Sequence, residues 1–69
     1  MEIKKSFGKK IQQIRKEKKL SQKQLCESIG MNRSYLAAVE NGSRNITLIN
    51  INKLAEGLQV SLSELFEDL

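Results

Sequence analysis

The side chains best suited to binding another molecule lie between positions 22 and 45 and are, apart from two alanines, polar, aromatic or cationic. These candidates are Gln22, Lys23, Asn32, Arg33, Ser34, Tyr35, Ala37, Ala38, Asn41, Ser43, Arg44 and Asn45. With no histidine and one cysteine, the chain offers no ligand set for a metal ion. It also lacks a paired-carboxylate cleft and a phosphate-cradling glycine loop, and 69 residues are too few to enclose a substrate. We therefore expect a binding protein without cofactors, and no enzyme.

The first element that positions these side chains is a short helix predicted over residues 22–29. Ser21 and Gln24 have the spacing of a capping box, in which the serine oxygen accepts from a backbone amide and the glutamine reaches back. Gly30 then ends the helix, because glycine adopts the left-handed conformation of a helix end at little cost. A tight turn follows.

A second helix is predicted over residues 33–40, with Asn32 as its N-cap and Leu36 and Val39 on its inward face. Together the two helices form a helix-turn-helix over residues 21–41. This arrangement exposes the second helix so that its first side chains can enter the major groove of DNA.

Arg33 is the strongest candidate for reading a base, since a guanidinium can pair with both O6 and N7 of guanine. Ser34 could bind a phosphate or a base edge, and the small Ala37 and Ala38 would let the helix lie close to the bases. Tyr35 has two interpretations, a phosphate contact through its hydroxyl or packing on the neighbouring loop. For Arg33 the alternative is a contact with phosphate alone.

The stretch from Leu20 to Asn45 resembles the helix-turn-helix of the phage-repressor and Cro family (XRE type). The residues that carry the resemblance are Leu20, Ser21, Gln22, Leu25, Gly30, Met31, Ser34, Leu36, Ala37, Val39, Glu40, Gly42 and Arg44. Cys26 departs from the pattern, which usually has alanine there, and we expect it to behave as a small buried hydrophobe. The resemblance extends over nearly the whole chain and implies an all-α, five-helix, lambda-repressor-like DNA-binding domain over residues 1–69.

The resemblance also assigns roles to individual positions. It implies that Gln22 grips a backbone phosphate, with Lys23 beside it, and such contacts fix the register on DNA without reading sequence. It places Arg44 and Asn45 over the DNA backbone, although an arginine at this point could instead enter the minor groove.

Arg15 and Glu40 are implied to form a structural ion pair that ties the first helix to the end of the second helix of the motif. The alternative is an unpaired arginine at the surface.

Three further helices are expected. The first covers residues 3–18, another covers residues 48–57 after a Thr47 cap, and the last opens with a capping box of Ser61 and Glu64. The inward-facing side chains expected in these helices are Ile3, Phe7, Ile11, Ile14, Leu48, Ile51, Leu54, Ala55, Leu58, Leu62 and Leu65.

The charge of the chain is unevenly distributed. Residues 1–19 hold eight lysines and arginines against two glutamates, whereas residues 20–69 hold four against six acidic residues. The basic end fits a flank that faces phosphates, or a solvated helix face. No apolar run approaches the roughly 20 residues of a membrane span, and no signal peptide opens the chain, so we expect a cytoplasmic protein without a membrane partner.

Ile49, Phe66 and Leu69 are an apolar surplus for so small a domain, and such a patch usually marks an interface. We expect a two-fold homodimer through the last two helices. Its two recognition helices, about 34 Å apart, would reach successive major grooves of a near-palindromic site in double-stranded DNA.

The combination of Arg33 and Tyr35 with the following Ser43, Arg44 and Asn45 is similar to the controller proteins of restriction–modification systems, and it also suits small repressors. We expect a transcriptional regulator with no small-molecule ligand. The alternative is a protein-interaction module on the same fold, an antitoxin-like or assembly domain without specific DNA binding.

Overall fold

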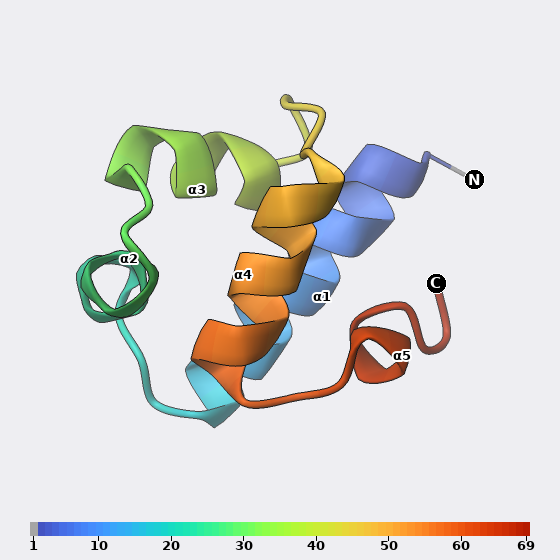
Figure 1. Ribbon diagram of the computed structural model, residues 1–69. Coiled ribbons are helices and arrows are strands. Elements are labelled where there is room, and N and C mark those ends of the chain that lie inside the picture. The colour runs from blue at the N-terminus through green and yellow to red at the C-terminus, as the bar shows by residue number, and fades with distance from the viewer. Residues whose placement is uncertain (1) are drawn as a thin grey trace.

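The computed structural model describes residues 2–69, and this part of the chain forms five helices and no strand (Figure 1). They are α1 (Ile3–Glu17), α2 (Gln22–Ile29), α3 (Arg33–Glu40), α4 (Leu48–Leu58) and α5 (Leu62–Leu65). The all-α, five-helix prediction is confirmed. None of these helices has the length and hydrophobicity needed to cross a lipid bilayer.

The helix starts agree with the capping chemistry read from the sequence. Ser21 and Gln24 form a complete capping box, as do Ser61 and Glu64. Thr47 caps α4 by accepting from the backbone amide of Asn50 at 3.2 Å. The two serine caps also explain why α2 and α5 start where they do, since each satisfies amides that a helix start leaves free.

Two helix ends differ from the prediction. The helix α1 stops at Glu17, with Lys18 as its C-cap, one residue earlier than expected. The helix α4 passes through Gly57 and ends at Leu58, one residue later than expected, because Gln59 takes the left-handed conformation (φ 58°). Glycine at position 57 leaves room for α2, since a Cβ there would overlap the Ile29 side chain.

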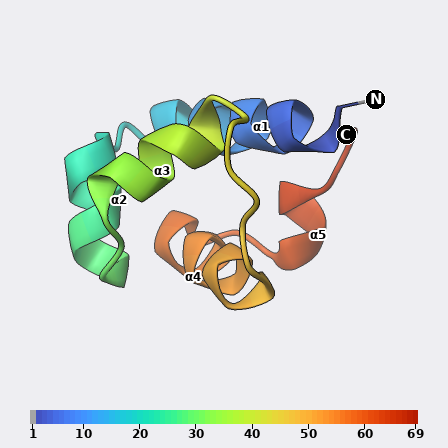
Figure 2. The same cartoon turned by 90° about the horizontal axis from the view of Figure 1, so that it is seen from above.

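The core lies between α1, α3 and α4, with α2 and α5 closing its ends (Figures 1 and 2). Its buried members are Phe7, Ile11, Ile14, Leu25, Cys26, Leu36, Val39, Leu54, Ala55, Leu58 and Leu65. Helical spacing in the sequence predicts that all of these except Cys26 face inward. Cys26 is 3% exposed, as expected of a small buried hydrophobe, and this burial raises the pKa of its thiol.

The prediction that Leu48 and Leu62 face inward is wrong, since these side chains are 78% and 44% exposed. Each is the first residue of its helix. Four residues make barely one turn, so α5 buries only Leu65. Ile3 is also exposed at the start of α1. Helical spacing gives the face of a side chain, but it does not say whether another element reaches over the end of that helix.

The predicted apolar surplus is partly corrected as well. Ile49 is 73% exposed and Phe66 is partly exposed, but Leu69 is half-buried against the core. Phe66 also stacks on Phe7, with ring centroids 5.2 Å apart. Leu48 is therefore an exposed apolar side chain of this set, whereas Leu69 is not.

Gly8 sets the distance between α1 and α3, because a Cβ at this position would overlap the backbone carbonyl oxygens of Val39 and Glu40. Replacing an ordinary helical glycine by alanine stabilises a helix by up to about 1 kcal/mol. Here the close backbone contact should reverse that sign. We predict that Gly8→Ala lowers the free energy of unfolding by on the order of 1–3 kcal/mol, the usual effect of overpacking.

Urea denaturation measures this change, with the exposed Gln13→Ala in the same helix as the control. We expect the control to stay within about 0.5 kcal/mol of the wild type. A Gly8→Ala variant as stable as the control would show that α1 and α3 do not need this close approach.

Candidate nucleic-acid interface

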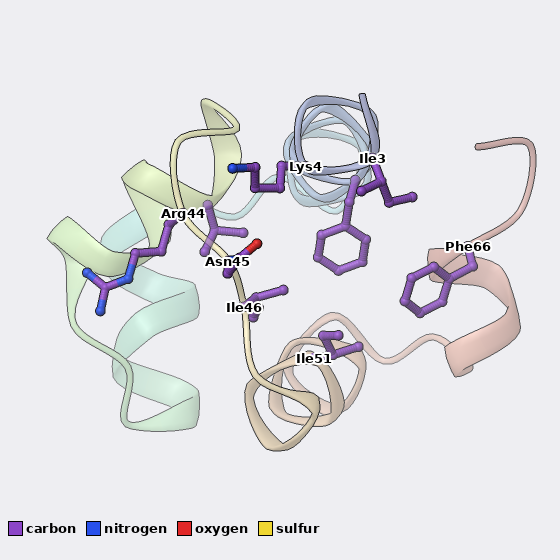
Figure 3. Close-up of a pocket in the computed structure, with 9 residues that line it drawn as sticks. Ile3, Lys4, Arg44, Asn45, Ile46, Ile51 and Phe66 are labelled. Carbon is purple, nitrogen blue, oxygen red and sulfur yellow. The ribbon is translucent and has the colours of Figure 1, made fainter. Parts of the chain in front are cut away.

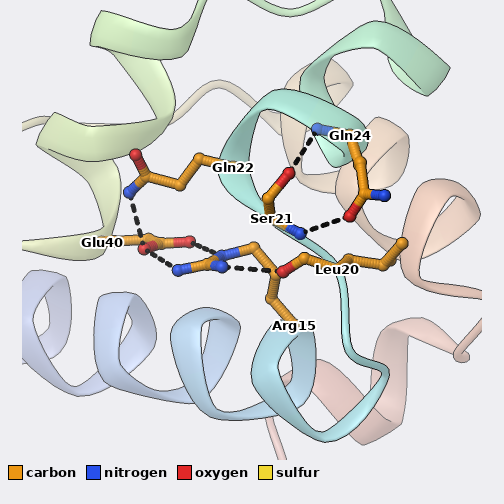
Figure 4. A network of polar contacts seen from close by, with 6 residues as sticks. All are labelled: Arg15, Leu20, Ser21, Gln22, Gln24 and Glu40. Atoms are coloured by element: carbon orange, nitrogen blue, oxygen red, sulfur yellow. Dashed lines mark hydrogen bonds and ion pairs between the residues drawn. The ribbon is translucent and has the colours of Figure 1, made fainter.

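A buried ion pair joins α1 to the last residue of α3 (Figure 4). Arg15 Nε donates to Glu40 Oε2 at 2.7 Å, and Arg15 Nη2 donates to Glu40 Oε1 at 3.1 Å. The remaining nitrogen, Nη1, donates to the backbone carbonyl of Leu20 at 2.8 Å. The hydrogen bond with Glu40 raises the pKa of Arg15. The pair is the one that the resemblance implied, and it anchors the turn before α2 as well as the end of α3.

Gln22 extends this network from the first position of α2, since its Nε2 donates to Glu40 Oε1 at 3.0 Å. Sequence reasoning gave Gln22 a contact with phosphate but no partner inside the protein. The two roles are compatible, because the amide nitrogen carries a second hydrogen that no hydrogen bond among residues 2–69 uses. Glu40 therefore orients the Gln22 amide. Lys23 is exposed beside it.

The outward face of α3 carries the side chains expected to meet DNA. Arg33 and Ser34 are exposed at its amino-terminal end, and Ala37 and Ala38 are half-buried along it. Asn32 caps the helix as predicted, since its Oδ1 accepts from the backbone amide of Ser34 at 2.8 Å. The structure thus leaves an arginine and a hydroxyl at the tip of α3, above a surface of small side chains.

Tyr35 packs on neighbouring elements, the second of its two predicted interpretations. Its hydroxyl accepts from Asn50 Nδ2 of α4 at 3.1 Å, and the Arg44 guanidinium lies 4.9 Å from the centre of its ring. This cation–π contact places the loop arginine beside α3. Sequence reasoning missed Asn50, because no local pattern connects residues fifteen positions apart.

The loop after α3 uses two of its polar side chains to close the helix. Asn41 Oδ1 accepts from the backbone amide of Ser43 at 2.9 Å, and the Ser43 hydroxyl donates to the Ala38 carbonyl at 3.3 Å. Gly42 turns the chain with a φ of 82°. Asn45 is exposed and its side chain enters no hydrogen bond in the described residues. Of the four loop candidates, Arg44, Asn45 and the amide nitrogen of Asn41 are thus left to face a ligand.

An apolar groove of about 180 Å³ lies between this loop, α1, α4 and α5 (Figure 3). Its walls include Phe7, Ile46, Ile51 and Phe66, and Arg44 lies at its edge. The groove thus brings the loop arginine and Phe66, the residue after α5, to one surface depression.

The described part of the chain contains no group of His, Cys, Asp and Glu side chains that could hold a metal ion.

Comparison with known proteins gives a consistent result. The family described as helix-turn-helix matches residues 11–65. The chain is 45% identical to the control protein C.MunI of Mycoplasma sp over 69 residues, which covers 99% of the chain and 93% of that protein.

Two solved structures are similar. The restriction–modification controller protein C.AhdI from Aeromonas hydrophila matches with a TM-score of 0.87 and 44% identity, over 90% of this chain and 94% of that one. The controller protein C.Esp1396I, crystallised as a tetramer in complex with its natural 35 base-pair operator, matches with a TM-score of 0.84 and 32% identity, over 91% and 83%.

The Arg15–Glu40 pair gives a prediction about stability. Glu40→Ala leaves a buried arginine without its partner, so the free energy of unfolding should fall by on the order of 3–5 kcal/mol. Replacing both residues by apolar ones of similar size, as in Arg15→Met with Glu40→Leu, should recover most of that loss. Thermal and urea unfolding of the three proteins measure both effects. A loss below about 1 kcal/mol in Glu40→Ala, the range of surface pairs, would contradict a structural role.

Proposed function

The chain belongs to this helix-turn-helix family, and on that premise we propose that it is a sequence-specific DNA-binding regulator of transcription. The observation that carries the proposal is the free amino-terminal end of α3, where Arg33 and Ser34 are exposed. That end is the part of a helix-turn-helix that enters the major groove. Residues 1–69 act as one DNA-binding domain, with residues 21–41 as its helix-turn-helix, and we assign it no catalytic activity.

The similar proteins support a narrower assignment. C.MunI is a control protein that matches over nearly its whole length, and C.Esp1396I is a controller protein whose structure contains operator DNA. We therefore propose that this chain is a restriction–modification controller or a small repressor of the same type. Such a protein acts on DNA in the cytoplasm. No observation favours the alternative of an interaction module that does not bind DNA.

Reading and positioning fall to different residues in this proposal. Arg33 reads a base edge, and Ser34 contacts a neighbouring base or phosphate. Gln22, Lys23 and Arg44 contact the phosphate backbone and fix the register. The supporting geometry is the exposure of Arg33 and the fixed orientation of the Gln22 amide. Asn32, Tyr35, Ser43 and the amide oxygen of Asn41 hold these groups in place. Asn45 lies over the backbone, and the small Ala37 and Ala38 let α3 lie close to the bases.

We propose that the chain binds as a two-fold homodimer through α4 and α5, with Leu48, Ile49 and Phe66 at the interface and Leu69 at its edge. The first three side chains are exposed in the single chain, and exposed apolar patches usually meet a partner. A closed two-fold dimer presents two α3 helices to one side of the duplex, so its site is a near-palindrome.

Selection of bound duplexes from a random pool tests the function. We expect enrichment of a near-palindrome whose half-sites are separated by about one helical turn, roughly 34 Å. A pool that stays random after selection would contradict sequence-specific binding.

Two variants then test, on the selected duplex, whether Arg33 reads bases and Gln22 only contacts phosphate. Arg33→Ala should lose preference between the selected duplex and one with altered half-sites by about 1–3 kcal/mol per half-site, because a bidentate base contact is removed. Gln22→Ala should weaken both duplexes alike. Competition titrations measure these changes, with circular dichroism and sedimentation as controls for fold and dimer. Equal loss of discrimination in both variants would contradict the assignment.

A further inference from the structure

The helix α1 runs beside α3, with α2 at one end of the pair (Figure 2). A polar hollow of about 420 Å³ lies where the first turn of α2 meets these two helices. The polar side chains that line it are Lys5, Lys9, Gln12, Gln22, Glu40 and Asn41. Three of them come from α1, a helix to which the proposed function assigns no contact with DNA.

The hollow is electrostatically positive. Both oxygens of Glu40 are occupied, Oε2 by Arg15 and Oε1 by Arg15 and Gln22. Arg15–Glu40 is the single ion pair found in residues 2–69, so neither Lys5 nor Lys9 is paired with a carboxylate there. The charge of Glu40 is offset by Arg15, and the two lysines add positive charge to the hollow.

The hollow also offers hydrogen-bond donors that have no other partner. The amide oxygen of Asn41 accepts from the Ser43 backbone, but its amide nitrogen has no acceptor among the described residues. The same holds for the second hydrogen of the Gln22 amide. Two ammonium groups and two amides around one opening suit a ligand that carries negative charge on several acceptor oxygens.

The helix that carries the two lysines is held against α3. Gly8, between the two lysines in sequence, allows α1 to touch the backbone at the end of α3. The stem of Lys5 packs on Gly42, where an added Cβ would lie 2.6 Å from Lys5 Cγ. Packing of the stem leaves the ammonium group as the free end of the side chain.

We infer that this hollow is a seat for phosphodiester groups of the DNA strand that borders the groove entered by α3. The inference rests on the proposed function and adds α1 to the DNA-binding surface, with Lys5 and Lys9 as its phosphate ligands. Gln22 and Asn41 donate to the same strand. The occupant is DNA because the seat opens beside the helix that reads it, next to Ala37 on the outward side of α3.

Salt dependence tests this seat, because each phosphate neutralised contributes about 0.9 to the slope of log K against log salt concentration. Lys5→Gln with Lys9→Gln should reduce the slope by about 1.8 per protomer. The matched control is Lys10→Gln with Lys18→Gln, which removes the same charge from the opposite side of α1, where both lysines border Glu17, Glu64 and Glu67. The control should leave the slope nearly unchanged, and Lys5→Arg with Lys9→Arg should preserve it.

Two single substitutions that each add a positive charge test the phosphate site independently. Gln12 lines the hollow, whereas its neighbour Gln13 lines a separate depression beside Asp68, which shares only Lys9 with the hollow. Gln12→Lys should steepen the slope by up to about 0.9 per protomer, and Gln13→Lys should not. Thermal unfolding of each variant confirms that it is folded.

The duplex is the one obtained by selection, and the wild type is titrated in parallel. A steep wild-type slope that falls equally in both glutamine pairs would overturn the phosphate seat and leave the proposed function standing. Equal effects of Gln12→Lys and Gln13→Lys would overturn it too. A wild type that binds no duplex would remove the proposed function and the seat together.

Discussion

The buried pair of Arg15 and Glu40 is the interaction on which the arrangement of this protein depends. It joins α1 to the end of α3, and through Leu20 and Gln22 it also fixes the chain that enters α2. Burying two charges costs free energy, which here is offset by four hydrogen bonds of good length. The described residues contain no buried side-chain polar atom without a partner. The pair therefore acts mainly by fixing geometry.

Much of the fold was predictable because its signals are local. The capping boxes, the left-handed Gly30 and the Asn32 cap depend on residues within a few positions of one another, and each is present in the structure. The prediction that the first residues of α4 and α5 are buried was wrong. Leu48 and Leu62 have the right spacing, but coverage of a first helical residue depends on elements distant in the sequence.

The candidate site was predictable to a similar extent. The exposed positions of Arg33 and Ser34 followed from the inward stripe of α3. The contacts of Tyr35 with Asn50 and Arg44 did not, because they join α3 to α4 and to the loop across the fold. The lysines of α1 were visible only as a basic run. Their place beside Gln22 depends on the packing of α1 along α3, which no local sequence pattern specifies (Figure 2).

In the proposed complex the ion pair sets the Gln22 amide against the phosphate backbone while α3 enters the major groove. A crystal structure of the protein bound to its selected duplex would show this arrangement. We expect Gln22 to keep its hydrogen bond to Glu40 and to donate its second hydrogen to a phosphate, with Arg33 at a base edge. A complex in which Gln22 leaves Glu40, or in which the tip of α3 lies outside the groove or against the partner subunit, would contradict it.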